Sequence, residues 1–167
     1  MDVSIDVGNY RFNYRVAGVI KKGSEILVHH ALKFNHVTLP GGRVKAGEDS
    51  ITALKREIEE EMGEKTEYIK PVAMVENIFR EEGKDYHEIL IIHELKFINK
   101  NAYERKIEPI EAHKKNKLEF FWYDLKKENK YGFVPRKLFN VLKDNNDNFI
   151  HVINDERGGL YVKPNTK

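Results

Sequence analysis

The residues from Gly41 to Gly63 read GGRVKAGEDSITALKREIEEEMG and end in a dense group of carboxylates. Four glutamates occupy five consecutive positions: Glu57, Glu59, Glu60 and Glu61. Like charges at neighbouring helical positions repel one another, so this composition disfavours a helix that has no counter-ion. Hard divalent cations bind through oxygen ligands and often complete their coordination with substrate phosphates. The segment therefore predicts a metal site carried by a helix.

Two local elements must position these carboxylates: a glycine-containing loop and the helix that follows it. Asp49 or Ser50 supplies the N-cap, and Gly63 stands where a left-handed C-terminal cap is usual, so we expect a helix that ends at Met62. Apolar residues recur along it at steps of three and four and form one stripe: Ile51, Leu54, Ile58 and Met62. The same spacing places three glutamates on one face beside that stripe: Glu57, Glu60 and Glu61. Glu59 falls away from this face and is expected in solvent.

Runs of β-branched and apolar residues predict strands in most of the remaining chain. We expect strands over six ranges: 14–20, 25–31, 36–39, 67–79, 87–97 and 118–125. The first two form a hairpin across a glycine-containing turn, and a charged turn at residues 80–86 joins the two long strands. A second helix is expected at residues 134–143, with Pro135 near its first turn and three residues on its inner face: Leu138, Phe139 and Leu142. The polar stretch 99–117 predicts a surface loop, and one more apolar run lies at 149–153.

Length and composition exclude several classes of protein. At 167 residues the chain has the length of one domain with a substantial core. Hydrophobic residues make up 40% and charged residues 34%, which excludes a membrane protein and an obviously disordered chain. No apolar run approaches the roughly 20 residues that cross a bilayer, and the first residues do not resemble a signal peptide. With no cysteine, disulfides and thiolate metal sites are excluded, and we expect a cytoplasmic location.

The net charge bears on possible partners, and the lack of repeats and linkers bears on the number of domains. A net charge of +2 gives no global attraction for a polynucleotide or a membrane, so a nucleotide-sized partner needs local positive groups. The sequence has no internal repeat, low-complexity segment or interdomain linker. We therefore expect one α+β domain with a mixed sheet over residues 1–167, with a core at about 12–145 and a C-terminal extension at 146–167.

The acidic segment also has a fixed internal spacing. Gly42 is followed after five residues by Glu48 and after seven more by the run Arg56-Glu57-Ile58-Glu59-Glu60-Glu61-Met62-Gly63. This pattern closely resembles the signature box of the Nudix hydrolase family, whose members include MutT-like proteins. The box covers about one seventh of the chain, and the order of the surrounding elements extends the resemblance to roughly residues 12–145. One position departs from the pattern: the last box residue, a bulky aliphatic residue in the family, is Glu64 here.

The resemblance implies an α/β/α sandwich and a hydrolase that cleaves nucleoside diphosphates linked to another group with Mg²⁺, for which Mn²⁺ can substitute. It implies that Glu57, Glu60 and Glu61 are metal ligands, with the carbonyl of Gly41 as a further ligand. By the same resemblance Glu57, Arg56 and Glu48 form the catalytic apparatus, in which Glu48 orients Arg56 or the loop and Arg56 holds a box carboxylate. Gly41 and Gly42 let the backbone approach the ion and the substrate closely.

The physical chemistry of the reaction agrees with this set of residues. A pyrophosphate ester carries several negative charges, which repel a nucleophile that approaches phosphorus. Divalent ions neutralise these charges and lower the pKa of a bound water, so that hydroxide forms near pH 7. A helix face supplies the rigid array of carboxylates that such ions need.

The general base and the substrate contacts stay open in the sequence. Seven glutamates are candidates for the base: Glu57, Glu81, Glu82, Glu88, Glu94, Glu108 and Glu111. Phe79 and Tyr86 lie near expected strand ends and are candidates for stacking on a nucleobase. Arg80 either contacts a phosphate or is simply solvated. Glu94 lies late in its strand, on the same face as Glu88, where it is a candidate for contact with the metal or the substrate.

The function that follows is a pyrophosphohydrolase in which water attacks phosphorus. Candidate substrates are a nucleoside triphosphate, ADP-ribose, a dinucleoside polyphosphate or a similar molecule, and no second signature selects among them. An alternative is a catalytically silent nucleotide-binding or sensor module. Every box carboxylate is present, which favours the enzyme. An isomerase on the same scaffold would need a nucleophilic cysteine, which the chain lacks. The sequence leaves association into a homodimer open.

Overall fold

The structure is a computed structural model that describes residues 1–110 and 117–158. The strands are β1 (Ser4–Val7), β2 (Tyr10–Lys22), β3 (Glu25–Ala31), β4 (His36–Val37), β5 (Gly41–Arg43), β6 (Thr66–Glu81), β7 (Lys84–Phe97), β8 (Leu118–Asp124), β9 (Gly132–Phe133) and β10 (Ile150–Glu156). The helices are α1 (Ser50–Met62), a 3₁₀ helix at Lys100–Tyr103, and α3 (Arg136–Asp144).

The main sheet is mixed and has the strand order β10-β6-β7-β2-β3-β8. β1 and β5 both pair with β2, and β4 pairs with β9 in a separate small sheet. The pairs β10–β6 and β7–β2 are parallel, whereas β6–β7, β2–β3 and β3–β8 are antiparallel. The parallel pairing of β2 with β7 brings together two segments about 75 residues apart, as in the register pair Asn13 and Glu88. The centre of the sheet is therefore built by long-range contacts.

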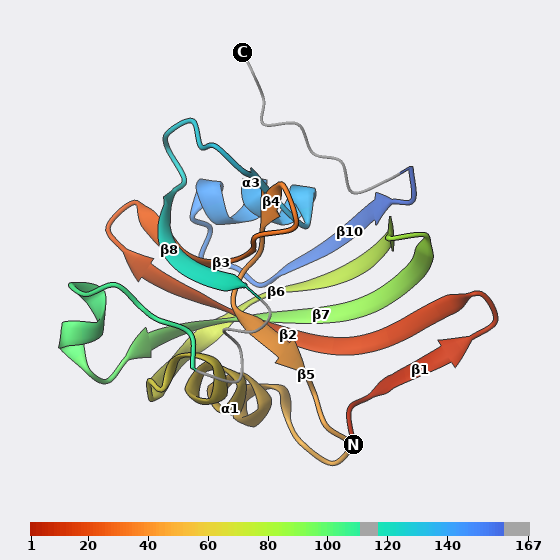
Figure 1. Ribbon diagram of the computed structural model, residues 1–167, viewed down its shortest axis with the longest axis horizontal. Helices are drawn as coiled ribbons and strands as arrows, with labels where there is room; N and C mark the ends of the chain where they lie inside the picture. Colours follow the sequence, from red (N-terminus) through yellow and green to blue (C-terminus); the bar gives the residue numbers. More distant parts are fainter. Residues whose placement is uncertain (111–116, 159–167) are drawn as a thin grey trace.

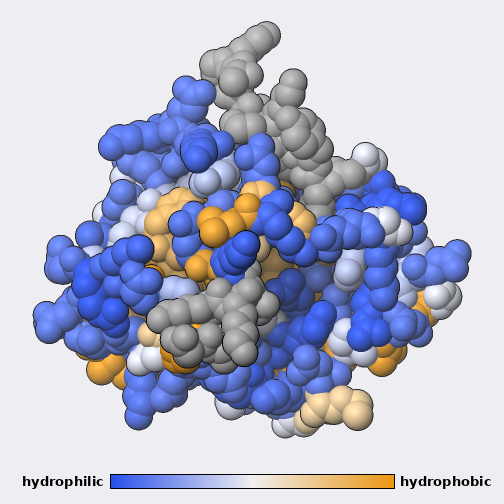
Figure 2. Space-filling view, in the orientation of Figure 1, coloured by the Kyte–Doolittle hydropathy of each residue, from blue (hydrophilic) through white to orange (hydrophobic). Residues whose placement is uncertain are grey.

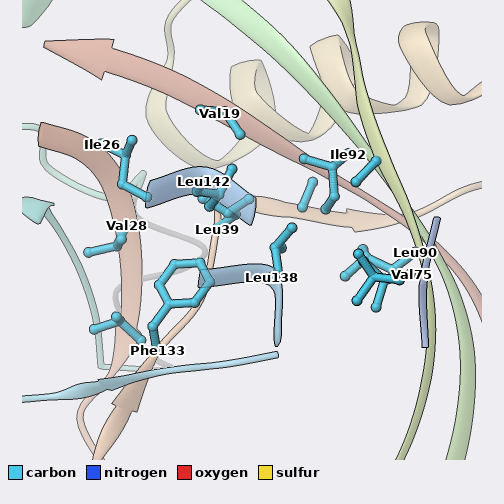
Figure 3. Close-up of a cluster of buried hydrophobic side chains, with 14 of the residues drawn as sticks. Val19, Ile26, Val28, Leu39, Val75, Leu90, Ile92, Phe133, Leu138 and Leu142 are labelled. Atoms are coloured by element: carbon cyan, nitrogen blue, oxygen red, sulfur yellow. The ribbon is translucent and has the colours of Figure 1, made fainter. Parts of the chain in front are cut away.

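Two hydrophobic clusters cover the two faces of the sheet. One cluster packs α1 against the sheet and includes Leu54, Ile58 and Leu95. The other packs α3 against the opposite face, where Leu138 and Leu142 lie among side chains of the sheet (Figure 3). Figure 1 shows α1 and α3 on opposite sides of the strands. This arrangement confirms the expected α+β fold, an α/β/α sandwich with a central mixed sheet.

The surface differs sharply from these cores. Hydrophilic residues cover most of the face seen in Figure 2, and hydrophobic residues gather near its middle. No helix within residues 1–110 and 117–158 combines the length and the apolar character needed to cross a bilayer.

The expected elements are present, with several boundaries displaced. The turn expected at residues 80–86 is reduced to Glu82 and Gly83, because β6 continues to Glu81 and β7 begins at Lys84. Both turn residues have positive φ, 48° and 80°, and a two-residue turn of this kind suits the twist of paired strands. The second helix begins at Arg136, so Pro135 is its N-cap residue.

The expected surface loop at residues 99–117 is more ordered than its polarity suggested. It contains the 3₁₀ helix Lys100–Tyr103 and buries Ala102 and Ile107 in the α1 cluster. Residues 111–116 of this loop lie outside the described residues.

Both ends of the described chain add strands to the sheet. β1, which the sequence reading did not anticipate, pairs with β2 in an antiparallel hairpin. β10 includes the apolar run at 149–153 and pairs in parallel with β6 from Ile150 to Glu156. Residues 150–156, expected as part of an extension, thus form an edge strand of the main sheet.

Candidate active site

The helix α1 is closed by side-chain and backbone caps at its two ends. Asp49 is the N-cap, and its Oδ1 accepts hydrogen bonds from the backbone N–H groups of Ile51 and Thr52, both at 2.9 Å. Gly63 ends the helix with φ of 71°, and its N–H donates to the carbonyl of Glu59 at 2.9 Å. These caps satisfy backbone groups that a helix otherwise leaves free, so the glutamates between them have fixed positions.

The apolar stripe sets which way each glutamate faces. Leu54, Ile58 and Met62 are buried against the sheet, as expected. Glu59 is exposed, and the Glu60 side chain is 50% exposed. Glu61 lies beside the stripe and is only 6% exposed. Glu57, Glu60 and Glu61 therefore form a row of carboxylates along α1, hereafter the acidic ridge, in which Glu60 is exposed and Glu61 is buried.

The glycine-containing loop crosses this ridge as strand β5. β5 pairs antiparallel with β2, so that Gly41 lies opposite Ala17 and Gly42 opposite Val16. A Cβ atom on Gly42 would lie 2.2 Å from the carboxyl carbon of Glu57. The Glu57 carboxylate thus lies directly against a backbone that has no side chain, and a Cβ atom there would displace it.

Arg56 ties the loop to the ridge. Its guanidinium donates to both carboxylate oxygens of Glu48, with Nε–Oε1 at 2.8 Å and Nη2–Oε2 at 2.9 Å. Its Nη1 also donates to Glu57 Oε1 at 2.6 Å and to Glu60 Oε2 at 3.2 Å, and Nη2 donates to the carbonyl of Arg43 at 3.1 Å. Charge-assisted and partly bidentate pairs of this kind are strong, and they also fix the orientation of the side chains. Arg56 holds the pKa of the Glu48 carboxyl at about 2, chiefly through these hydrogen bonds.

The buried end of the ridge has unusual electrostatics. Burial raises the pKa of Glu61 to about 8, and the negative charges of Glu57 and, less strongly, Glu60 act in the same direction. The positive charge of Arg15 opposes this shift. Glu61 Oε2 is buried and has no hydrogen-bond partner within the described part of the chain. A buried acceptor of this kind is costly unless another group satisfies it.

These observations fit a divalent cation. The ridge offers hard oxygen donors, one of them buried and unpartnered, beside a glycine loop whose backbone can come close. Across residues 1–110 and 117–158 no three or more His, Cys, Asp or Glu side chains are gathered closely enough to hold an ion as they stand. Arg56 occupies one carboxylate oxygen of Glu57 and one of Glu60.

A pocket lies on the other face of the sheet, under α3. Its walls include apolar residues of the α3 cluster and its surroundings: Leu39, Phe79, Leu90, Ile92, Val134 and Leu138. Its polar side includes five residues from strands of the sheet: Arg15, Asn77, Glu81, Glu88 and Glu156. A pocket with apolar walls and a few polar groups is typical of a small-molecule site.

Four strands contribute a continuous row of hydrogen-bonded side chains to this face, hereafter the polar row. Glu88 Oε1 accepts from Asn13 Nδ2 at 3.3 Å, and Glu88 Oε2 accepts from Asn77 Nδ2 at 3.2 Å. Asn77 Oδ1 accepts from Asn154 Nδ2 at 2.8 Å. Asn154 Oδ1 accepts from the backbone N–H of Lys137 in α3 at 3.2 Å. The row therefore satisfies its own buried polar groups and links the sheet to the second helix.

Arg15 connects the pocket with the acidic ridge. It lines the pocket, and its Nη1 lies 3.8 Å from Glu88 Oε1. Its charge also acts on Glu61, and its strand position is opposite Arg43 of β5. Arg15 Nε is buried without a hydrogen-bond partner in the described structure. A guanidinium with an unused donor between a pocket and a carboxylate ridge is well placed to meet an anionic group.

The structure brings some of the expected substrate residues to the pocket and not others. Phe79 lines the pocket and stacks on Tyr86, with ring centres 4.9 Å apart. Arg80 lies near the β6–β7 turn, where it bonds to Asp85 and to the Gly83 carbonyl. It is not among the described residues that line the pocket.

Glu94 lies elsewhere on β7. It forms ion pairs with Lys21 at 3.3 Å and Lys70 at 3.9 Å, six residues along the strand from Glu88. Glu94 shares a face with Glu88, as expected, but its partners hold it away from the described pocket lining. The expected contact of Glu94 with the substrate therefore finds no geometric support.

The other candidates for the general base have distinct surroundings. Glu81 lines the pocket, where burial, followed by the charge of Glu82, raises its pKa. Glu82 pairs with Lys33 at the turn, and Glu108 pairs with Lys106. Both oxygens of Glu88 are already hydrogen-bonded in the polar row. Glu111 lies outside the described residues.

The departure at the last box position has a local explanation. Glu64 is buried, and Arg105 and Asn99 hydrogen-bond to its Oε1. A buried carboxylate is tolerated when it is paired in this way. The expectation of altered packing after the helix thus corresponds to an ion pair between residue 64 and the loop that follows β7.

Sequence reasoning missed three residues of the pocket: Arg15, Asn77 and Glu156. A signal was present, because Asn77, Asn154 and Glu156 occupy inward positions of strands that are otherwise apolar at alternate residues. Arg15 lies on the same face of β2 as Asn13, next to the apolar positions Ala17 and Val19. Without the pairing of the strands, however, nothing shows that these polar residues meet.

Solved structures of other proteins share this fold. A UDP-X diphosphatase aligns with a TM-score of 0.59 and 14% identity, over 84% of this chain and 66% of that one. An ADP-ribose pyrophosphatase from Streptococcus suis 89-1591 aligns with a TM-score of 0.56 and 11% identity, over 84% and 98%. A MutT Nudix hydrolase from Burkholderia pseudomallei gives 0.58 and 19%, over 81% and 98%. At these identities the likeness shows the fold alone.

The family is shown by the sequence. Among curated proteins none matches the chain. The model of the NUDIX domain matches residues 11–141, which is most of the chain and includes the acidic ridge, Arg56 and the glycine loop. The chain therefore belongs to the Nudix family, a family of pyrophosphohydrolases.

Proposed function

We propose that the protein is a metal-dependent hydrolase that cleaves the pyrophosphate bond of a nucleoside diphosphate linked to another group. The observation that carries the proposal is the position of the acidic ridge against the glycine loop, where the Glu57 carboxylate lies over Gly42 and Glu61 Oε2 has no partner in the described structure. A carboxylate array of this kind, linked to a pocket through Arg15, suits a substrate that is anionic at one end and planar at the other.

The acidic ridge would hold Mg²⁺ or Mn²⁺ through Glu57, Glu60 and Glu61, with the carbonyl of Gly41 as a further ligand. When bound, such an ion neutralises phosphate charge and lowers the pKa of a bound water. Glu48 and Arg56 are positioning residues in this proposal. Arg56 fixes Glu57 and Glu60, and Glu48 fixes Arg56, so the carboxylates keep one arrangement.

The pocket under α3 would receive the nucleoside. Phe79 and Leu138 supply apolar surface for a flat ring, and Arg15 lies between this surface and the ridge. The guanidinium of Arg15 would then meet the phosphate nearest the nucleoside, while the ridge meets the bridge that is cleaved. Water attacks one phosphorus of the bridge, and the products are a nucleoside monophosphate and the remaining phosphorylated group.

The names of the solved relatives support this class of substrate. One is a UDP-X diphosphatase and another an ADP-ribose pyrophosphatase, and both names describe a nucleoside diphosphate joined to a second group. We also propose a cytoplasmic location, since the sequence contains no cysteine.

A substrate panel tests the proposed function. Purified protein with Mg²⁺ or Mn²⁺ is incubated with nucleoside triphosphates, ADP-ribose, dinucleoside polyphosphates and 5′-triphosphorylated RNA, and product release is measured. We expect cleavage of at least one member of the panel, and loss of that cleavage on chelation of the metal. Release of no product from any member contradicts the proposal, and tight binding of an uncleaved nucleotide would indicate a binding module instead.

Two nearly isosteric variants, Glu60→Gln and Glu61→Gln, are run beside the wild type. Each removes one anionic ligand and keeps the shape of the side chain, so we expect lost turnover with the fold retained by circular dichroism. Glu59→Gln is the matched control, because Glu59 lies on the same helix and is exposed. Wild-type rates in both ridge variants would remove these residues from the mechanism.

A further inference from the structure

We infer that Glu156 selects the nucleobase and that it selects guanine, the base that offers two adjacent N–H donors on one edge. The inference rests on the proposed function, because it names the substrate class of the same site. Nothing in the family signature touches Glu156, which lies beyond the residues 11–141 that match the NUDIX domain.

The fold places Glu156 in the pocket through the register of the edge strand. Side chains at alternate positions of β10 face α3, and Val152 and Asn154 are buried on that face. Glu156 continues the same face and lies opposite Phe79 of β6. Glu156 and Phe79 both line the pocket. Glu156 therefore lies next to an aromatic residue in the lining of the pocket.

Both carboxylate oxygens of Glu156 are buried and lack a hydrogen-bond partner among the described residues. The side chain as a whole is 13% exposed. Its nearest cation is Arg136, whose Nε lies 3.8 Å from Oε1, beyond hydrogen-bonding distance, on a side chain that is 61% exposed. Arg136 thus supplies a compensating charge and leaves both oxygens free to accept. A buried carboxylate with two unused acceptors indicates a ligand that brings two donors.

Two other polar groups of the pocket are already occupied. Glu88 and Asn77 are hydrogen-bonded to each other and to their neighbours in the polar row. Within the described pocket lining, the buried side-chain nitrogen and oxygen atoms without a partner belong to Glu156 and Arg15. The buried and unpartnered atoms of the described pocket lining are therefore two acceptors at β10 and one donor on β2, the strand that pairs with the glycine loop.

The edges of the common nucleobases differ in how they meet a carboxylate. Guanine presents the N1–H and the N2 amino group side by side, and an ionised carboxylate accepts both at once. Adenine and cytosine each place a ring acceptor next to their amino group, and uracil places a carbonyl on each side of its single N–H. In these three bases one acceptor faces an oxygen of Glu156. A site built on hydrogen bonds rejects such bases, because its buried polar groups stay unpaired.

The test on the substrate side compares guanosine, inosine, adenosine and uridine nucleotides on the wild-type protein. We expect kcat/KM for GTP to exceed that for ATP and UTP by about a hundred-fold, with ITP in between because it keeps N1–H and lacks the 2-amino group. Binding of GMP, IMP and AMP, measured by titration calorimetry, should follow the same order. Equal binding of GMP and AMP, or binding of neither, overturns the inference.

The test on the protein side is Glu156→Gln. An amide keeps the shape of the side chain and replaces one acceptor with a donor, which suits the donor and acceptor that adenine presents together. We expect the GTP to ATP ratio of kcat/KM to fall at least roughly tenfold. The matched control is Asp155→Asn, one residue earlier on the opposite face of β10, which should leave the ratio unchanged. An unchanged ratio in a folded Glu156→Gln protein also overturns the inference.

The two proposals fail in different ways. If GMP binds selectively and no nucleotide is cleaved, the hydrolase fails and the role of Glu156 stands. If nucleotides are cleaved without regard to the base, the role of Glu156 fails and the hydrolase stands. The comparison of GMP with IMP and AMP uses only the wild-type chain, so the inference is tested even if Glu156→Gln does not fold.

Discussion

The acidic ridge and the pocket under α3 lie on opposite faces of one sheet and are built in opposite ways. The ridge, its caps and its glycine loop all come from residues 41–63, so their geometry follows from one helix and one strand. The described pocket lining comes from separate segments, including β2, β6, β7 and β10. The comparison teaches that the chemistry is encoded locally, whereas the shape that selects a ligand is assembled by long-range pairing.

The largest expected effect is on turnover, and it distinguishes the acidic ridge from the pocket. Glu61→Gln should lower kcat by two to three powers of ten, because metal ions supply several kcal/mol of charge stabilisation and Glu61 is the buried member of the ridge. Binding of a nucleoside monophosphate in the pocket should be unchanged. Turnover is measured by phosphate-ester release and binding by calorimetry. A parallel loss of monophosphate binding would show that the two regions are one unit.

Substitutions that create equivalent cavities under α1 and α3 test the comparison further. Leu54 in α1 and Leu138 in α3 are both completely buried. Leu54→Ala and Leu138→Ala should each lower the free energy of unfolding by about 3 kcal/mol, which urea titration can measure. At a temperature where both remain folded, Leu54→Ala should reduce kcat, since it loosens the ridge.

Leu138→Ala should instead raise KM with little change in kcat, because Leu138 is a wall of the pocket. Identical kinetic changes in both variants would contradict the separation of chemistry from recognition.

A smaller effect distinguishes two adjacent glycines. A Cβ on Gly42 would lie 2.2 Å from the Glu57 carboxyl carbon, at the flexible end of a side chain, so Gly42→Ala should displace Glu57 and lower kcat/KM about tenfold. A Cβ on Gly41 would lie 2.1 Å from the backbone oxygen of Val16, which cannot move without disturbing β2. Gly41→Ala should therefore act mainly on stability. Thermal unfolding and kinetics of both variants check this difference, and an unstable Gly42→Ala would contradict it.

The smallest expected effect is the acid sensitivity of the loop. Arg56 lowers the pKa of Glu48 from 4.5 to about 2, so the ionised pair stabilises the folded state fully above pH 4.5. This contribution is lost as pH falls from 4.5 towards 2, since protonation then favours the unfolded chain. Glu48→Gln removes it, and the difference in unfolding free energy from wild type should be about 1 kcal/mol or less above pH 4.5. The difference should shrink towards pH 2, and a difference that grows there would contradict the assignment.

Sequence reasoning succeeded where the relevant contacts are local. Residue types predicted the caps, Asp49 or Ser50 at the start and Gly63 at the end, and the N-cap is Asp49. The burial of Leu54 and Ile58 follows from helix periodicity and is also present. The strands were also recognised, although the turn between β6 and β7 was expected to be too long. Charged residues at the ends of twisted strands look like loop residues in a sequence, and only the pairing of Arg80 with Asp85 shows that the strands continue.

Sequence reasoning was least informative where residues meet only because strands pair. Glu94 was a candidate for contact with the metal or the substrate because it lies late in its strand. In the structure it forms ion pairs with Lys21 and Lys70, six residues along β7 from Glu88. An even separation along a strand determines that two side chains lie on the same face of the sheet. It does not determine where along the strand each side chain meets other groups. No pattern in the sequence indicates a role for Glu156, since a glutamate near the end of an apolar run is usually solvated.

By itself the sequence determined the acidic ridge, its helix and the glycine loop, because an α-helix of known period converts spacing directly into a face. It also determined the family, through residue types at fixed separations. Only the tertiary structure decided that Arg15 lines the pocket while its charge acts on the acidic ridge. It also decided that the members of the polar row hydrogen-bond to one another, and that both carboxylate oxygens of Glu156 stay without a partner in the described structure. These facts depend on the register between strands far apart in the chain, which no local pattern specifies.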